Sequence, residues 1–235
     1  MIGLACKQGS STWDILRMSV WVSASDVPAV LHSNPFTSRR ALWNWKVGRK
    51  ARPAVFSPAI DHGHVGEAEA IAAIVAQFPQ HSFHQPGTVI GVDPGLRLSC
   101  SPDLVEVDER GELVAGWEIK TPWTRPIPRN PESVYLEHTL QALANSLVFH
   151  GRGNWLGWNL YYHDRGEPGY NPGRHFWVTA DPGAGELMAD EVERFNRAVQ
   201  YVDCEDGGET KRKTRKIQEI LEGIQVTQLL PDGPV

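Results

Sequence analysis

The sequence Ser-Pro-Asp at 101–103, followed by Trp-Glu-Ile-Lys-Thr-Pro at 117–122, decides the fold and points to the chemistry. Asp103 stands directly before a short apolar run at 104–107, and a polar turn containing Gly111 leads to a second apolar run from Leu113 to Ile119. Two β-like runs joined by a polar, glycine-containing turn predict a β-hairpin.

In a strand, residues two positions apart point to the same face. Glu118 and Lys120 are therefore expected on one face, with Ile119 turned into the core and Asp103 close by on the partner strand. Charged groups gathered at the end of a sheet are costly to bury unless they are paired or bind a metal. Two carboxylates beside an ammonium group suit a hard divalent cation and a lysine that orients a water molecule.

Length and composition allow one large domain, or one domain with appendages, and 41% hydrophobic residues are enough for a core. The sequence contains no apolar run long enough to span a membrane and no signal-peptide pattern. Cys6, Cys100 and Cys204 are far apart in the sequence, which argues against a disulfide scaffold and a four-cysteine metal site. We therefore expect a cytoplasmic protein, in the host cytoplasm if a phage encodes it. The net charge of −5 does not by itself support nucleic-acid binding.

The N-terminal third predicts two short helices. Ser25 is a candidate N-cap for a helix at 26–31, and Thr37 or Ser38 for a helix from Arg39 to Val47 that ends at Gly48. Trp13 and Arg17 have the spacing of an i, i+4 pair on a helix. A basic stretch with interleaved tryptophans could contact a duplex backbone or form a solvated helix face; its basic residues are Arg39, Arg40, Lys46, Arg49, Lys50 and Arg52.

The alanine-rich segment 58–76 predicts a helix that carries a third candidate acid. Glu67 and Glu69 lie about 200° apart on a helix, so both cannot face one ion, and we choose Glu67. His62 and His64 are either metal ligands or polar histidines at the mouth of the site.

Strand-like patterns occur at 83–92, 154–163 and 174–179, and helical patterns at 133–150, 184–202 and 211–224. The loop at 122–131 is rich in proline and arginine and could contact DNA. Within the helix at 133–150, Gln141 could be a surface residue by its pattern alone; it is a candidate site residue, with His138 as the alternative, only through a family resemblance in the order of the motifs. The basic run from Lys211 to Lys216 could contact DNA, a partner subunit or only solvent.

The order of these motifs resembles that of the YqaJ-type viral recombinase family, which includes the lambda-type exonucleases and belongs to the PD-(D/E)xK nuclease superfamily. The resemblance covers residues 8 to 163. Its motifs are Gln-Gly at 8–9, Trp13 with Arg17, Ser-Ala-Ser-Asp at 23–26, Asn-Pro-Phe-Thr-Ser at 34–38, L-W-x-x-K-x-G-R at 42–49, Gly63 with Glu67, S-P-D at 101–103 and E-I-K at 118–120. This chain departs from the family pattern in having Leu104 after the aspartate and a longer gap before Glu118.

The resemblance implies a restriction-endonuclease-like (PD-(D/E)xK) α/β fold, with a central mixed β-sheet flanked by helices. We expect the nuclease domain at 1–180 and a helical C-terminal extension at 181–235 that packs on it or extends it. The resemblance also implies a site. Mg²⁺, or Mn²⁺ as a substitute, would be held by Glu67, Asp103, Glu118 and the Ile119 carbonyl, with Lys120 beside the attacking water. The phosphate would be bound by Arg17, Ser25, Ser101 and Gln141.

The implied function is Mg²⁺-dependent digestion of one strand, 5′→3′, from double-stranded DNA ends during phage-type recombination. A single-strand annealing protein is an implied partner, and a homotrimer an implied assembly. Two alternatives remain at this point: a structure-specific or restriction-type endonuclease on the same fold, and a non-catalytic DNA-binding protein. No G-x-x-x-x-G-K-[ST] phosphate loop is present, which argues against a coupled helicase in this chain.

Overall fold

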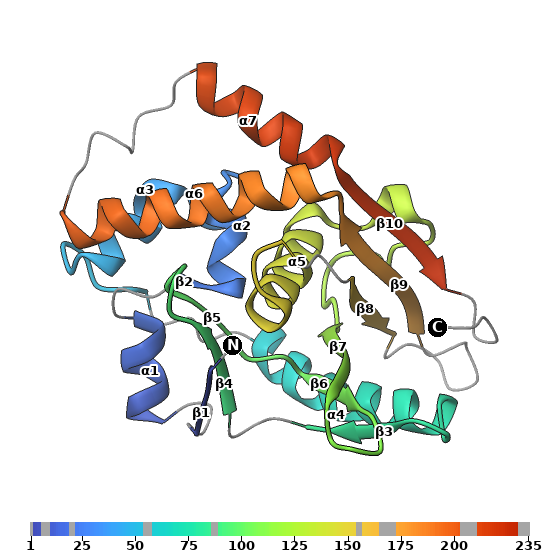
Figure 1. Ribbon diagram of the computed structural model, residues 1–235. Helices are drawn as coiled ribbons and strands as arrows, with labels where there is room; N and C mark the ends of the chain where they lie inside the picture. Colours follow the sequence, from blue (N-terminus) through green and yellow to red (C-terminus); the bar gives the residue numbers. More distant parts are fainter. Residues whose placement is uncertain are drawn as a thin grey trace.

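A computed structural model describes residues 2–5, 10–18, 22–53, 58–85, 89–153, 157–164, 173–202 and 211–229. Helices surround two β-sheets, with one helix, α5, near the centre (Figure 1). The elements in chain order are β1 (Ile2–Ala5), α1 (Ser11–Met18), β2 (Val22–Ser23), η1 (Ala24–Asp26), α2 (Val27–Val30), α3 (Arg39–Lys46), α4 (Pro58–Gln77), β3 (Ser82–His84), β4 (Val89–Asp93), β5 (Leu98–Cys100), β6 (Leu104–Val107), β7 (Leu113–Lys120), η2 (Pro131–Ser133), α5 (Leu136–His150), β8 (Trp158–His163), β9 (Gly173–Ala180), α6 (Pro182–Gln200), α7 (Lys211–Glu222) and β10 (Ile224–Leu229).

The larger sheet has six strands in the order β10-β9-β8-β7-β6-β3. Only β7 and β8 pair in parallel, and the other neighbours are antiparallel, so the sheet is mixed, as predicted. The predicted hairpin is confirmed: β6 and β7 are antiparallel, with Leu104 opposite Trp117. The Asp103 N–H donates to the Trp117 carbonyl at 3.2 Å, which places Asp103 beside the C-terminal part of β7.

The smaller sheet has the order β1-β4-β5-β2, and in Figure 1 it lies next to α1. The segment 83–92, which is strand-like but broken by proline and glycine in the sequence, forms two strands: β3, at the edge of the larger sheet, and β4, inside the smaller one. Pro86 and Gly87 separate the two in the sequence. Proline lacks the N–H that a ladder needs, so one continuous strand is disfavoured there.

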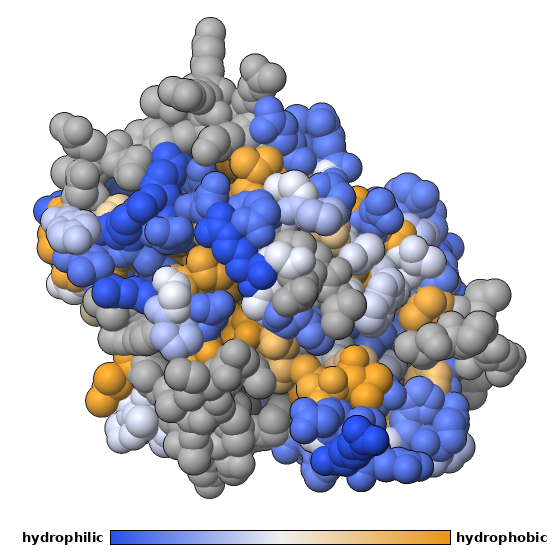
Figure 2. Space-filling view, in the orientation of Figure 1, coloured by the Kyte–Doolittle hydropathy of each residue, from blue (hydrophilic) through white to orange (hydrophobic). Residues whose placement is uncertain are grey.

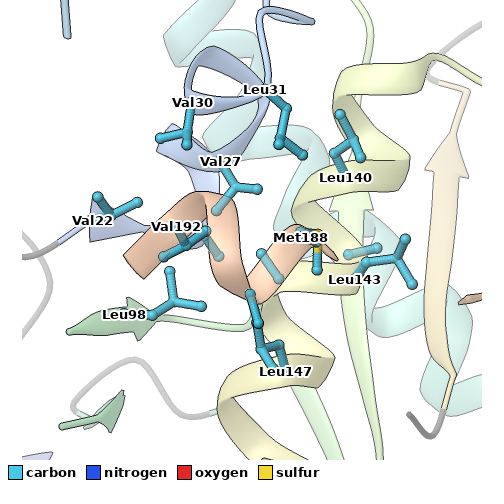
Figure 3. Packing of buried hydrophobic residues seen from close by; sticks show 14 of the residues in the cluster. Val22, Val27, Val30, Leu31, Leu98, Leu140, Leu143, Leu147, Met188 and Val192 are labelled. Carbon is cyan, nitrogen blue, oxygen red and sulfur yellow. The ribbon is translucent and has the colours of Figure 1, made fainter. Parts of the chain in front are cut away.

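Helices cover both faces of the larger sheet. On one face Trp117 and Ile119 pack with Ala70 and Ile74 of α4. On the other face the leucines of α5 meet the inward side chains of β8 and β9 and the helix α6 (Figure 3). Because β7 alternates between these faces, Glu118 points to the α5 side, as the two-residue period predicts.

The long helices at 58–77, 136–150, 182–200 and 211–222 confirm the helical predictions to within a few residues. Ser38 caps α3, where its side chain accepts from the Ala41 N–H. The prediction that Ser25 caps the preceding helix is wrong. Asp26 stands at the N-cap of α2, and Ser23 caps the 3₁₀ turn η1 before it, forming a reciprocal capping pair with Asp26.

The final strand, β10, was not predicted. The helical pattern was extended to Ile224, whereas α7 ends at Glu222 and β10 pairs along β9, with Ile224 opposite Ala180. The segment after 181 is therefore not only helical. Gly223 makes the turn possible, because a Cβ there would overlap the side chains of Asp181 and Ala184.

Among the residues that Figure 2 colours by hydropathy, hydrophilic ones predominate on this face, and the hydrophobic ones form small groups between them. Within the described part of the chain, no helix has the length and apolar character needed to cross a membrane.

Gly116 lets the indole of Trp158 lie across β7. A Cβ at position 116 would overlap that ring, and Trp158 is fully buried, so the ring has no free space to enter. We expect Gly116→Ala to destabilise the protein by about 3 kcal/mol through overpacking. Gly63→Ala is the matched control: its Cβ would meet only Thr121 Oγ1 at 3.9 Å, and alanine favours the helix by up to about 1 kcal/mol. Urea unfolding should give opposite signs for the two variants. Equal stability of Gly116→Ala and the parent protein would contradict the packing described.

Candidate active site

Glu118 lies at the centre of a hydrogen-bonded group between the sheet and α5. Its side chain is 2% exposed, and both carboxylate oxygens accept hydrogen bonds. Oε1 accepts from Lys120 Nζ at 2.6 Å and from Gln141 Nε2 at 2.7 Å. Oε2 accepts from Asn145 Nδ2 at 2.7 Å. The carboxylate is thus held in one orientation by one charged donor and two amides.

Lys120 is the last residue of β7 and shares the face of Glu118. Its ammonium group donates to Gln141 Oε1 at 3.0 Å as well as to Glu118. Burial lowers the pKa of Lys120, but the charges of Glu118 and Asp103 outweigh that effect, and the net pKa is raised. Lys120 therefore stays charged at neutral pH. A lysine ammonium has three N–H groups, so one more donor can point toward a substrate.

Asp103 approaches Glu118 from the start of β6. Its Oδ2 accepts from the Ile119 backbone N–H at 2.6 Å, a contact that fixes it beside β7. Burial, then the charge of Glu118, raises the pKa of Asp103 well above its usual range, and Glu67 adds to this effect. Lys120 only partly opposes the shift. The site therefore has more negative charge than its own lysine compensates.

Glu67, on α4, is electrostatically linked to the same group. Burial raises its pKa, His64 lowers it, and Glu118 raises it further. The competing acid, Glu69, is exposed and lies 3.5 Å from His163 Nε2 on β8. Of the two acids, Glu67 is the one that interacts electrostatically with Glu118 and Lys120 of β7. The structure also places the His62 ring edge-on to Trp123, with the ring centroids 4.7 Å apart.

The donor set fits a magnesium-type cation. Mg²⁺ prefers oxygen ligands and usually binds through one or two carboxylates, several waters and substrate phosphates. Asp103 and Glu118 supply such carboxylates, and their mutual repulsion is the kind that a bound cation relieves. Among the described residues, no group of three or more His, Cys, Asp or Glu side chains is placed to hold a metal ion, so Glu67, Asp103 and Glu118 do not form one ligand set by themselves. A cation at this site would take its remaining ligands from water and substrate phosphate.

A pocket of about 170 Å³ adjoins Asp103. It brings together residues from the smaller sheet, from η1, α1 and α5, and from the segment just before β6. The predicted phosphate-binding residues Ser25, Ser101 and Gln141 all line it, although they are far apart in the sequence. Its other lining residues are Trp13, Ser23, Ala24, Ile90, Ser99, Cys100 and Asn145. Burial raises the pKa of the Cys100 thiol well above its usual range, so Cys100 is an unreactive neutral group in this wall.

Arg17 lies in α1, in the same helix as the pocket residue Trp13, but its side chain is outside the described part of the structure. Its predicted role in binding a terminal phosphate stays a prediction. The side chains of the basic run from Lys211 to Lys216 are also outside the described part.

Two residues of the basic stretch are structural, contrary to the idea that the whole stretch faces DNA. Arg39 is buried, donates to the Val30 carbonyl at 2.6 Å and pairs with Glu191. Lys46 is buried against Asp26 at 3.1 Å. The sequence alone could not show that Arg39 and Lys46 are buried and their basic neighbours exposed, because their acidic partners belong to other elements. The exposed basic residues of the stretch are Arg40, Arg49 and Lys50.

Asn145 was missed at the sequence level. It is 1% exposed and follows Gln141 by one helical turn, so both amides reach Glu118 from the same face of α5. The i, i+4 spacing of Gln141 and Asn145 is the feature of the sequence that could have identified Asn145 as a site residue. Gln141 itself was expected to bind phosphate. The structure shows both ends of its amide already engaged, by Lys120 and by Glu118.

Comparisons with known proteins bear on the fold. The chain is similar to a crystal structure of an alkaline exonuclease, LHK-Exo, from Laribacter hongkongensis, with a TM-score of 0.59 and 20% identity over 88% of this chain and 100% of that one. A second structure, LHK-Exo in complex with dAMP, gives a TM-score of 0.61 and 19% identity with the same coverage. No protein-family model and no curated protein matches the chain. The architecture is thus similar to the nuclease-like fold of an alkaline exonuclease, and the predicted central mixed sheet flanked by helices is confirmed.

Proposed function

We propose that the protein is a Mg²⁺-dependent DNA exonuclease that digests one strand 5′→3′ from double-stranded ends. The observation that carries this proposal is the meeting of Asp103, Glu118 and Lys120 at the end of β7, beside a polar pocket. Such a site has no structural use that an apolar core would not serve better. The fold it shares with an alkaline exonuclease supports the proposal, as does that enzyme's complex with a nucleoside monophosphate, dAMP.

In the proposed reaction, Asp103, Glu118, Glu67 and the Ile119 carbonyl would hold Mg²⁺, with Mn²⁺ as a substitute. Bound there, the cation would polarise the phosphate and lower the pKa of an attacking water. Lys120 holds that water or a phosphate oxygen with its remaining N–H and offsets the charge that develops on the phosphate. Gln141 and Asn145 keep Glu118 in place throughout, because they bond to opposite oxygens of its carboxylate.

The pocket is the proposed position of the terminal phosphate, where Ser25 and Ser101 provide hydroxyl donors and Arg17 a positive charge. The proposal extends to a role in recombination by strand annealing, with a single-strand annealing protein as partner and a homotrimer as the assembly. These finer points follow from the resemblance of the sequence motifs.

The proposal is tested by a time course on linear duplex DNA that carries its label at either the 5′ or the 3′ end, with Mg²⁺ or with EDTA. With Mg²⁺ we expect early release of 5′-labelled mononucleotide and gradual shortening of the 3′-labelled strand. EDTA should stop both. A covalently closed plasmid should stay intact, since it has no end. Linearisation of the plasmid would instead show an endonuclease, and absence of any cleavage would refute the nuclease assignment.

A further inference from the structure

The loop that follows β7 is held rigidly. Tyr135, just before α5, donates from its hydroxyl to the Pro126 carbonyl at 2.6 Å. The Arg125 guanidinium lies over the Tyr135 ring, 3.4 Å from its centroid, and pairs with Glu137. Prolines at 122, 126 and 128 further restrict the backbone. The loop therefore presents its side chains in a fixed arrangement.

This rigid loop exposes a large aromatic ring. Trp123 is 56% exposed, although most tryptophans of known burial in this chain lie in the core or against it. The His62 ring meets it at an interplanar angle of 71°, an edge-to-face contact that supports the indole from the α4 side. A fixed, exposed and supported indole is what a stacking platform requires, because little side-chain entropy remains to be lost on binding.

Trp123 also lies next to the proposed reaction centre. It follows Lys120 by three residues, a distance of at most about 11 Å along the chain. Thr121 Oγ1 donates to the Gly63 carbonyl at 3.4 Å, which joins the first residue of the loop to the part of α4 that carries His62. Glu67 follows Gly63 by four residues in the same helix. A strand whose phosphate lies at Lys120 would therefore bring its neighbouring nucleotides to this ring.

We propose that Trp123, supported by His62, stacks on a nucleobase one or two nucleotides from the phosphate that is cleaved. The inference rests on the proposed nuclease function and adds to it a base-binding site that is indifferent to sequence. Every base has a π-face, and stacking on an aromatic side chain contributes about 1–3 kcal/mol per base. The platform would keep the end of the strand unstacked from its complement while the phosphate is held at the carboxylates.

The test measures the affinity for a short, end-labelled duplex by fluorescence anisotropy, in EDTA so that no cleavage occurs. Trp123→Ala should weaken binding about 10-fold, and Trp123→Phe should restore most of the affinity because it keeps a ring. Tyr201→Ala is the matched control: Tyr201 is 72% exposed at the end of α6, outside the site, and its loss should leave the affinity unchanged.

Abasic substrates identify the base. Each duplex in a series lacks one base, at a different distance from the end. The parent protein should bind one duplex of the series more weakly than the others, and this duplex identifies the stacked base. At that position, Trp123→Ala should cause no further loss. If the substitution weakens intact and abasic duplexes equally at every position, Trp123 does not stack on a base and the inference fails. A change in sedimentation with unchanged DNA affinity would also overturn it, by showing that Trp123 covers a subunit contact.

Failure of the inference can be told from failure of the proposed function. If the parent protein digests linear DNA with Mg²⁺ but Trp123→Ala behaves like it in every assay, only the stacking site is refuted. If the parent protein neither binds nor digests DNA, the proposed function itself is refuted, whatever the variant does.

Discussion

Asp103→Asn should abolish DNA digestion and at the same time stabilise the metal-free protein. Asparagine can still accept the Ile119 N–H through its Oδ1, so the fold around β7 is kept. The substitution removes a carboxylate that is buried and repelled by Glu118 and Glu67. Without a cation this relief should raise the free energy of unfolding by on the order of 1 kcal/mol. Loss of a cation ligand should lower the cleavage rate at least about 1,000-fold, which corresponds to about 4 kcal/mol of lost transition-state stabilisation.

Two measurements check this prediction: the initial rate on linear duplex with Mg²⁺, and urea unfolding in EDTA and in Mg²⁺. Mg²⁺ should stabilise the parent protein, because a ligand that binds only the folded state stabilises it, and should not stabilise Asp103→Asn. The control is Asp108→Asn, since Asp108 also accepts backbone N–H groups, from Arg110 and Glu112, but in an exposed turn. It should change neither quantity. Retained activity in Asp103→Asn would remove Asp103 from the site.

Lys120→Met should also be inactive, but with the opposite effect on stability. Methionine fills much of the same space and removes the ammonium group that faces Glu118 at 2.6 Å. Glu118 is then left as a buried charge held only by amides, which should cost about 3 kcal/mol of stability. The rate should fall by about 100- to 1,000-fold, the usual effect of losing one well-placed electrostatic group.

Arg110→Met, at an exposed cation of the turn between β6 and β7, is the control and should leave the stability and the rate nearly unchanged. Adding Glu118→Gln to Lys120→Met removes the uncompensated charge. The double variant should recover much of the lost stability but none of the activity. If Lys120→Met were as stable as the parent, the ion pair would not be formed in solution. If it kept its rate, the proposed role of Lys120 would be wrong.

The sequence was most informative where the argument was local. The hairpin and the shared face of Glu118 and Lys120 depend only on a two-residue period and a glycine-containing turn, and both are confirmed. The helix from Pro58 to Gln77 follows from alanine content in the same way. The helical angle showed only that Glu67 and Glu69 cannot both face the site, and the choice of Glu67 came from the Gly63–Glu67 motif of the resemblance.

Features that depend on distant partners could not be predicted in this way. The split of 83–92 between two sheets depends on which strands pair with each half. The strand β10 is defined by β9 and by the close approach of Gly223 to Asp181. The burial of Arg39 depends on Glu191, far along the chain, and the role of Asn145 depends on a helix crossing a strand. None of these partners is visible from the neighbouring residues.

The central helix α5 has a consequence for how this protein can change over evolution. Its leucines 140, 143 and 147 are part of the main core (Figure 3), whereas Gln141 and Asn145 on the same helix fix Glu118. The same two amides line the pocket against the smaller sheet. A shift of α5, caused by repacking far from the carboxylates, would therefore displace both Glu118 and the adjoining pocket. Substitutions in the interior would thus alter the geometry of the candidate site as well, and compensating substitutions should concentrate where α5 contacts its neighbours.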